Sequence, residues 1–363
     1  MADAVVQFEN LVKIFSEGSK KEVRAVDDFS LSVNRGDLVT LLGPSGCGKT
    51  TSLRILAGFE NATAGSVYID GQRVNDIPPQ NRNTSMVFQS YGLFPHMTVK
   101  ENVAYGLRVK HVHKKEINTR VKDVLALVGL VGLESRSVAK LSGGQQQRVA
   151  LCRAIITKPE VLLFDEPLSN LDAKLRKGTR EQIRQLQQDL GITSVYVTHD
   201  QAEAMSISDW VAIMQDGKLQ QLGPAEEVYS RPANRFVADF IGEANLLPGV
   251  ITDTNSGGVS ISLYGSEIAL DRFGSEFTRD QAVDIVVRPE AVDIVDTPDG
   301  DISATIQFSH YTGSIVIYTM RLEDGQELSV QVSNPMERGV LPAGQIVGIH
   351  LHRKSLHVLP KEG

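Results

Sequence analysis

The order of apolar and polar residues in the first two thirds of the chain is typical of short buried strands that alternate with helices. Five short apolar runs occupy residues 37–42, 84–88, 161–164, 195–198 and 211–214. Between them, Val121, Val124, Leu125 and Val128 recur at helical spacing, and a further helix is expected over residues 173–190. This alternation predicts βαβ units and therefore a parallel sheet, an α/β fold.

Toward both ends of the chain the pattern changes to alternating apolar and polar residues, which is typical of strands with one buried face. Residues 5–14 and 25–33 predict two such strands. After Ala244, turns rich in Gly, Pro and Asp separate the alternating segments 259–263, 283–287, 302–308, 315–320, 328–332 and 346–351. These segments predict an antiparallel β barrel or sandwich. We therefore expect an α/β domain over residues 1–242 and an all-β domain over residues 243–363.

Composition narrows the class of protein. A length of 363 residues suits two domains, and a formal net charge of −7 argues against nucleic acid as the main partner. No apolar run approaches the ~20 residues that cross a bilayer, and no basic segment followed by an apolar core marks a signal peptide. Cys47 and Cys152 form no disulfide framework, which favours a reducing, cytoplasmic compartment.

A glycine-rich loop follows the run at residues 37–42 and precedes a helical segment. Its residues are Gly43, Pro44, Ser45, Gly46, Cys47, Gly48, Lys49, Thr50 and Thr51. The glycines let the backbone wrap around phosphate oxygens, Lys49 supplies a positive charge, and the Thr50 hydroxyl can bind Mg²⁺. A chance glycine turn is the alternative, but the strand before the loop and the helix after it favour a phosphate site. We call residues 43–50 the phosphate loop.

Four polar side chains lie at the ends of predicted strands. Asp165 and Glu166 end the run 161–164, where Asp165 is a candidate Mg²⁺ ligand and Glu166 a candidate general base. Gln89 could bind Mg²⁺ and the attacking water, and His199 could contact the γ-phosphate or handle a proton. Taken singly, each has an ordinary alternative: a solvated strand end, a surface glutamine or a structural histidine.

A second glycine-rich segment lies about a hundred residues after the first. Ser142, Gly143, Gly144 and Gln145, which we call the signature segment, stand directly before an apolar run, so backbone N–H groups are expected at a helix start. A simple helix N-cap would also explain this serine. One nucleotide does not need two phosphate cradles. Either this chain binds two phosphates, or the signature segment serves a nucleotide held by another copy of the chain.

The series of motifs, in this order, resembles the ATP-binding cassette ATPases over residues 5–242. The resemblance implies a phosphate-loop NTPase fold with a helical subdomain at about residues 90–155, and it implies ATP and Mg²⁺ as ligands. It also implies that two cassettes pack head to tail, so that the signature segment of one copy closes over the ATP of the other. Phe15 would stack on adenine, and residues 169–172, with Asp172, would cross the dimer interface.

Two further segments are similar to those of bacterial importers of this family. Residues 90–102 are similar to the segment that receives a short helix of the membrane subunit, and residues 243–363 resemble the appended, oligonucleotide-binding-fold-like TOBE domain. The resemblance implies a peripheral ATPase at the cytoplasmic face of the inner membrane. Its partners would be a second copy, permease subunits and, indirectly, a solute-binding protein. The cargo would be a polyamine, ferric iron or a related solute such as a sugar or phosphonate.

A soluble cassette protein that acts on ribosomes or DNA is the alternative from another class. Such proteins carry two cassettes or a long coiled-coil insertion, whereas residues 99–153 are too few for such a coil. An exporter cassette is a third possibility, against which the β domain counts. Whether that domain binds a regulator stays open.

Overall fold

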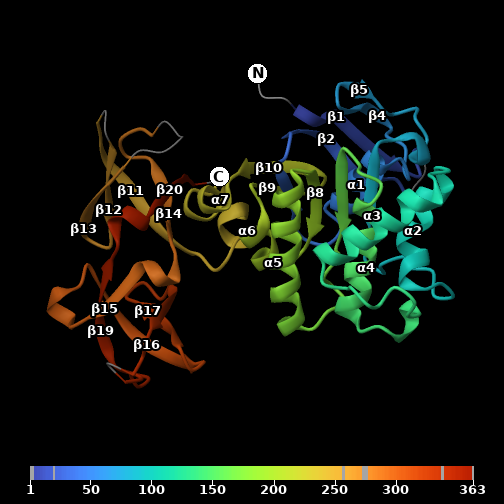
Figure 1. Cartoon of the computed structure of the whole chain (residues 1–363). Helices are drawn as coiled ribbons and strands as arrows, with labels where there is room; N and C mark the ends of the chain where they lie inside the picture. The colour runs from blue at the N-terminus through green and yellow to red at the C-terminus, as the bar shows by residue number, and fades with distance from the viewer. Residues whose placement is uncertain (1–3, 19–20, 256–257, 272–276, 337–338, 362–363) are drawn as a thin grey trace. The chain divides into compact units, whose positions relative to one another are not determined.

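The computed structural model describes residues 4–18, 21–255, 258–271, 277–336 and 339–361 of the chain (Figure 1). The chain divides into two compact units, Met1–Ala225 and Glu226–Gly363. Each unit has its own hydrophobic core, so each is described separately.

A six-stranded sheet forms the centre of the first unit, in the order β10-β9-β3-β8-β7-β6. Its strands are β3 (Leu38–Leu42), β6 (Thr84–Val87), β7 (Val161–Asp165), β8 (Thr193–Thr198), β9 (Trp210–Gln215) and β10 (Lys218–Gly223). All neighbours pair in parallel except β10, which pairs antiparallel with β9. The predicted parallel sheet is confirmed, and its parallel arrangement brings the carboxyl ends of β3, β6, β7 and β8 to one edge.

A second, antiparallel sheet in the first unit has the order β2-β1-β4-β5. Its strands are β1 (Ala4–Phe15), β2 (Val23–Asn34), β4 (Ala64–Ile69) and β5 (Gln72–Arg73). The alternating residues of β1 and β2 bury Phe8 and Phe29, which share a core with Leu53 of the first helix. The alternation is regular in β2, where Phe29, Leu31 and Val33 are buried, whereas both Val5 and Val6 of β1 are buried.

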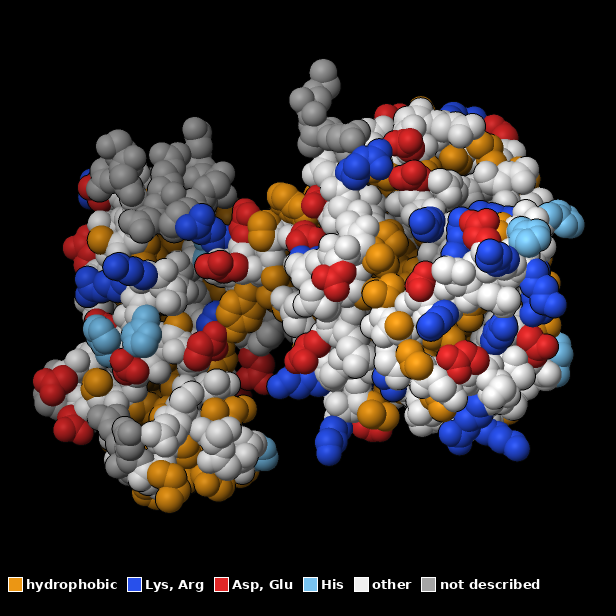
Figure 2. All heavy atoms as spheres, in the orientation of Figure 1, with side chains coloured by type: hydrophobic (Ala, Val, Ile, Leu, Met, Phe, Trp, Pro, Cys, Tyr) orange, Lys and Arg blue, Asp and Glu red, His pale blue; other side chains and the backbone are white. Residues whose placement is uncertain are grey.

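Six α-helices are found among the described residues of the first unit. They are α1 (Lys49–Ala57), α2 (Val99–Val109), α3 (Lys114–Leu127), α4 (Gly143–Ile155), α5 (Ala173–Leu190) and α6 (Gln201–Ile207). Figure 1 shows α2, α3 and α4 grouped together, and they share one core that includes Val103, Val121 and Val149. On the face seen in Figure 2, Lys and Arg side chains gather toward these helices, with Asp and Glu between them. The predicted helical region is therefore present as a three-helix group.

In the described residues, the second unit contains two short α-helices and two antiparallel sheets. The helices are α7 (Ala225–Ser230) and α8 (Arg235–Phe240). One sheet has the order β13-β12-β11-β14-β20, and the other has the order β15-β19-β16-β17-β18. Their bounds are β11 (Asn245–Asn255), β12 (Gly258–Leu263), β13 (Ser266–Asp271), β14 (Ala282–Val287), β15 (Val292–Val295), β16 (Ile302–Tyr311), β17 (Ile315–Leu322), β18 (Glu327–Ser333), β19 (Ile346–Leu351) and β20 (His357–Pro360).

The two sheets of the second unit share a single hydrophobic core. Leu247 and Ile285 come from one sheet, and Tyr318 and Ile349 come from the other; all four are buried. The predicted all-β C-terminal fold is confirmed. Short 3₁₀ helices occur in both units, at Pro79–Asn81, Val138–Lys140, Pro289–Ala291, Thr297–Asp299 and Arg353–Ser355.

Candidate nucleotide site

The phosphate loop connects β3 to α1 at the carboxyl edge of the parallel sheet. Gly48 is the N-cap of α1 with a left-handed φ of 103°, and no side chain caps this helix. Lys49 is only 5% exposed, and its ammonium group donates to the carbonyl oxygens of Gly43 (2.6 Å) and Pro44 (2.9 Å). A buried ammonium group and uncapped N–H groups together form a site for an anion.

Two glycines of the phosphate loop are required by close backbone contacts. A Cβ at Gly43 would lie 2.2 Å from Met214 O, and a Cβ at Gly48 would lie 2.3 Å from Ala25 O. Gly46 has a φ of 85°, and a Cβ there would meet no atom of the described residues within 4 Å. The loop is thus held tightly from behind and left open at Gly46, as a phosphate cradle requires.

Asp165 ends β7 beside the first turn of α1. The Thr50 hydroxyl donates to Asp165 Oδ1 at 3.3 Å. Burial raises the pKa of Asp165 above its usual range, although the Arg54 guanidinium and the Thr50 hydroxyl act in the opposite direction. A carboxylate and a hydroxyl held together in a partly desolvated position are hard oxygen donors of the kind that Mg²⁺ prefers.

Glu166 adopts a backbone conformation that is rare for a side chain of its type. Its φ is 45°, in the left-handed region, and its N–H donates to Val197 O of β8 at 3.0 Å. Non-glycine residues in this region cost about 1–3 kcal/mol and persist where the surrounding structure fixes them. The hydrogen bond to β8 is such a constraint, and it fixes the direction in which the Glu166 carboxylate leaves the sheet.

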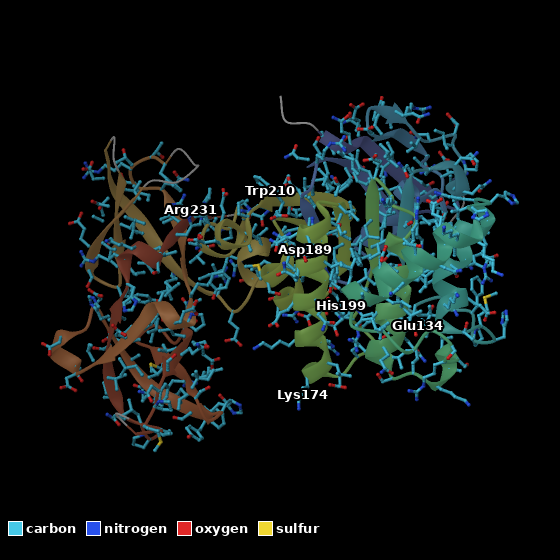
Figure 3. The ribbon with its side chains drawn as sticks, in the orientation of Figure 1. Glu134, Lys174, Asp189, His199, Trp210 and Arg231 are labelled. Atoms are coloured by element: carbon cyan, nitrogen blue, oxygen red, sulfur yellow. The ribbon has the colours of Figure 1, made fainter. Side chains whose placement is uncertain are left out.

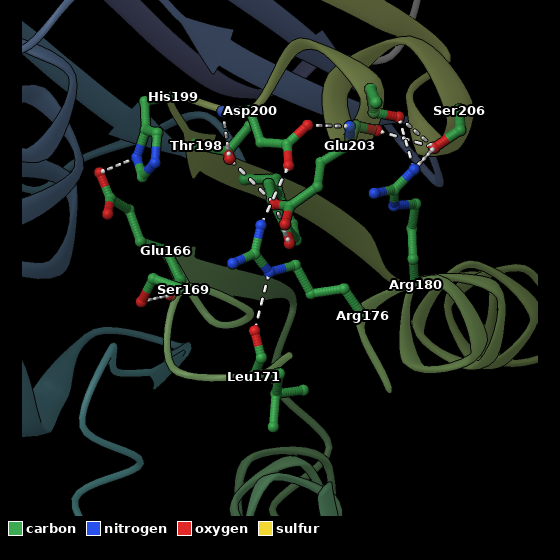
Figure 4. Close-up of polar contacts among 12 residues, drawn as sticks. Glu166, Ser169, Leu171, Arg176, Arg180, Thr198, His199, Asp200, Glu203 and Ser206 are labelled. Carbon is green, nitrogen blue, oxygen red and sulfur yellow. Dashed lines mark hydrogen bonds and ion pairs between the residues drawn. The ribbon is translucent and has the colours of Figure 1, made fainter. Parts of the chain in front are cut away.

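The predicted catalytic residues from three strand ends lie together. Figure 4 shows the His199 and Glu166 side chains in contact; Nδ1 of His199 is 3.2 Å from Oε1 of Glu166, and Gln89 Nε2 donates to Glu166 Oε2 at 3.4 Å. The Glu166 side chain is 21% exposed and that of His199 is 59% exposed, so both can reach a ligand. Glu166 therefore stands between an amide and an imidazole at the edge where open α/β sheets bind ligands.

The signature segment starts α4 and satisfies its own helix end. The Ser142 side chain accepts from Gln145 N (3.4 Å), and the Gln145 side chain accepts from Ser142 N (3.1 Å), which is a capping box. A Cβ at Gly143 would lie 3.3 Å from Leu171 Cδ2, so the Leu171 side chain packs beside it. Asp172 caps α5 by accepting from Leu175 N at 3.0 Å. The bonds of Ser142 and Asp172 thus stay within their own segments, and nothing ties these residues to the phosphate loop of the same chain among the described hydrogen bonds.

Phe15 lies at the end of β1 and is 38% exposed. The Lys13 ammonium group is 4.7 Å from the centre of its ring. A partly exposed aromatic ring is suitable for stacking on a base, although no described contact joins it to the phosphate loop.

Sequence reasoning missed the residues that support the loop of His199. Glu203, in α6, is 3% exposed, and its Oε2 accepts from the Tyr196 hydroxyl (3.1 Å) and the Thr198 hydroxyl (2.9 Å). Asp200 caps α6 by accepting from Glu203 N at 3.0 Å. An Asp three residues before a Glu is a sequence pattern typical of a helix start, and this pattern could have identified Asp200 and Glu203 from the sequence.

The fold and the site define a phosphate-loop protein of the α/β class with a second, glycine-rich helix start. Residues 26–169 match the family described as ABC transporter, and residues 285–359 match the TOBE domain. The Fe(3+) ions import ATP-binding protein FbpC 1 of Pectobacterium atrosepticum is 53% identical over 260 residues, which cover 72% of this chain and 71% of that protein. The spermidine/putrescine import ATP-binding protein PotA of Clostridium novyi is 49% identical over 253 residues, which cover 70% and 72%.

Solved structures agree with these relatives. The dimeric structure of MJ0796, a bacterial ABC transporter cassette, is 30% identical, with a TM-score of 0.54, and the match covers 61% of this chain and 98% of that one. The chain therefore belongs to the ABC transporter family, and it is an ABC transporter ATPase with a TOBE domain in its C-terminal part. The family resemblance expected from the motifs is confirmed. Across the described residues, we find no helix with the length and apolar character of a membrane span.

Proposed function

We propose that the chain hydrolyses ATP to energise a bacterial importer of ferric iron or a polyamine. The observation that carries the proposal is the meeting of Gln89, Glu166 and His199 at one carboxylate, at the same sheet edge as the phosphate loop. The printed functions of the relatives from Pectobacterium atrosepticum and Clostridium novyi support import and the two cargo classes.

The phosphate loop, residues 43–50, and Thr51 bind the phosphates of ATP, and Phe15 stacks on the adenine. Lys49 neutralises phosphate charge from a buried position, which makes its contribution large. Thr50, Asp165 and Gln89 would hold Mg²⁺, and the oxygen donors 3.3 Å apart at Thr50 and Asp165 fit this ion. When bound, Mg²⁺ supplies positive charge to the phosphate oxygens during transfer.

Glu166 acts as the general base that takes a proton from the attacking water. Gln89 and His199 contact its two carboxylate oxygens and so hold the carboxylate in one orientation. His199, whose side chain is the more exposed of the two partners in its pair, contacts the γ-phosphate. The strained backbone of Glu166 keeps this carboxylate at the sheet edge as ATP enters and leaves.

The second ATP contact comes from another copy of the chain. Ser142, Gly143, Gly144 and Gln145, together with Asp172, complete the site of the partner copy, so ATP closes a homodimer with two nucleotides. The exposed position of Ser142 and the dimeric arrangement of the MJ0796 cassette support this assembly. Permease subunits dock on the helical subdomain, at residues 90–102, which gives the chain its place at the cytoplasmic face of the membrane.

The functional division that we propose is a nucleotide-binding domain over residues 1–242 and a TOBE-like domain over residues 243–363. The TOBE match at residues 285–359 lies within the second part. Which cargo the importer carries is decided by uptake of labelled ferric iron and labelled spermidine in cells with and without the chain. Loss of one uptake activity identifies the cargo, and loss of neither contradicts both assignments.

The test of the mechanism is the Glu166→Gln variant. Hydrolysis should be abolished while ATP still binds, so a nucleotide-loaded dimer should accumulate and elute earlier than the ATP-free chain in gel filtration. Glu181→Gln, at an exposed position of α5, is the matched control and should behave as the unaltered chain. Normal turnover by the Glu166→Gln variant would remove Glu166 from the general-base role.

A further inference from the structure

Three arginines of α5 form a row at four-residue spacing, on the side that faces α6. Arg180 donates to Ala202 O at 2.8 Å, and Arg184 donates to Asp209 Oδ2 at 2.9 Å. Arg176 is the first of the row, and Figure 4 shows it between Leu171 and Asp200. All three therefore connect α5 to the segment that follows β8.

Arg176 differs from the other two because it also reaches back to the segment before α5. Its Nε–H donates to Leu171 O at 2.9 Å, and its Nη1 lies 3.6 Å from Asp200 Oδ2. One guanidinium group thus joins two segments that are distant in the sequence. The planar, forked geometry of this group holds both partners in a fixed relative position, whereas the ammonium group of a lysine acts as a point charge on a flexible chain.

Leu171, one of the two partners of Arg176, packs against the signature segment. Leu171 is 4% exposed, and its Cδ2 lies 3.3 Å from where a Cβ of Gly143 would stand. Asp172, the next residue, caps α5. A displacement of the Leu171 backbone would therefore be felt at the start of α4 as well as at the start of α5, because buried contacts of this kind do not deform smoothly.

The Asp200 side leads to His199. The two carboxylate oxygens of Asp200 have different partners: Oδ1 accepts from Glu203 N, and Oδ2 faces Arg176. The Asp200 N–H donates to the Thr198 hydroxyl at 3.0 Å. The turn that contains His199 is thus fixed on both sides of that residue, and the His199 ring meets Glu166.

We propose that Arg176 is a positioning residue that couples the two halves of the nucleotide chemistry within one chain. It joins Leu171, beside the signature segment that serves the partner's ATP, to the turn of His199, which serves the chain's own ATP. The inference rests on the proposed function, because it assigns the two sides of the link to different nucleotides. A partly exposed ion pair alone would contribute little to stability, so the effect of Arg176 is on geometry at Glu166 and His199.

The test compares Arg176→Ala with Arg180→Ala in the full chain. Arg176→Ala should lower kcat by about tenfold or more, because small misplacements of reacting groups are costly, whereas the Kd for ATP should change less than about twofold. Arg180→Ala loses a similar tie between α5 and α6 but not the link to Leu171, and it should retain kcat. Equal losses in both variants, or an unchanged kcat in Arg176→Ala, would overturn the proposal.

Two further variants separate a loss of kcat from a folding defect, and Glu166→Gln separates failure of this inference from failure of the proposed function. Arg176→Lys retains the charge but not the fork, and it should show the same fall in kcat at an unchanged melting temperature. Asp200→Asn retains the cap of α6, and combining it with Arg176→Ala should lower kcat less than the product of the single effects. If Glu166→Gln still turns over, the proposed function fails. If Glu166→Gln is inactive but the Arg176 variants are normal, only this inference fails.

Discussion

The chain contains two glycine-rich helix starts, and they are built in opposite ways. The start of α1, in the phosphate loop, has a glycine N-cap, no side-chain cap and a buried lysine. The start of α4, in the signature segment, has a complete capping box and an exposed serine. The N–H groups of the first helix start are available to an anion, whereas the second helix start is capped by its own side chains in the absence of an anion.

This difference indicates how each start contributes to the ATPase. A helix start whose N–H groups have no side-chain partner gains most when phosphate binds, so the phosphate loop should dominate nucleotide affinity. A helix start that is capped by its own side chains is stable without a nucleotide, and it can contact the ATP of another copy when the two copies associate. Its contribution should therefore fall on turnover rather than on binding to the single chain.

The largest expected effect is that of Lys49→Ala. Removing a buried ammonium group from a charged partner typically costs roughly 2–5 kcal/mol, so ATP affinity should fall about a hundredfold. Titration with a labelled ATP analogue measures it. Lys122→Ala, at an exposed position of α3, should leave affinity unchanged. If Lys49→Ala still binds ATP normally, the phosphate loop does not dominate nucleotide affinity, and the proposed difference between the two helix starts is wrong.

The next effect in size is that of Ser142→Ala. Turnover should fall at least about tenfold, because one donor to developing phosphate charge is lost, while ATP affinity of the single chain is retained. The loss of the cap should also cost about 1 kcal/mol of stability. Steady-state hydrolysis and urea unfolding, followed by the fluorescence of Trp210 (Figure 3), measure the two effects. Trp210 is the single tryptophan of the chain and reports on the first unit.

A matched control separates capping from catalysis. Thr98 and Glu101 form a capping box at the start of α2 like that of Ser142 and Gln145. Thr98→Ala should therefore lower stability by a similar amount while turnover of the chain is retained. If Thr98→Ala and Ser142→Ala lose turnover equally, the signature segment is only a helix cap.

Much of the cassette was predictable because its signals are local. The phosphate loop, Asp165 and Glu166 lie at the ends of apolar runs whose short length favours buried strands, and parallel pairing then brings the strand ends together. The meeting of Gln89 and His199 at Glu166 follows from the same rule. Their roles stay predictions, since geometry shows that the side chains meet and not what they do.

The rest depended on contacts that no local pattern records. Arg176 looks like any arginine of an amphipathic helix, and only the fold brings Asp200 to it. In the second unit, β11 contains Pro248 and Gly249, which indicate a turn in the sequence but lie within a strand. Close packing requires the glycine, because a Cβ at Gly249 would lie 2.7 Å from Ile261 Cγ2 and 3.0 Å from Ile285 Cδ1, and both of these residues come from neighbouring strands.

The smallest expected effect concerns Glu203, which belongs to neither helix start. Its ionisation changes the stability of the folded chain with pH, so any comparison of the two helix starts at different pH must allow for it. Burial raises the pKa of Glu203, even though the Thr198 and Tyr196 hydroxyls donate to it. The folded state then favours the protonated form, so the contribution of Glu203 to stability is complete below its unfolded pKa of about 4.3 and is lost as pH rises through its higher folded pKa. Relative to Glu203→Gln, which cannot ionise, the unaltered chain should lose stability as the pH rises from 4.5 to 8. Urea unfolding at the two pH values, followed by Trp210 fluorescence, measures the difference.

The control, Glu181→Gln, should show no such pH dependence. A Glu203→Gln curve parallel to that of the unaltered chain would mean that the Glu203 carboxylate is solvated and that its turn is held by Asp200 alone.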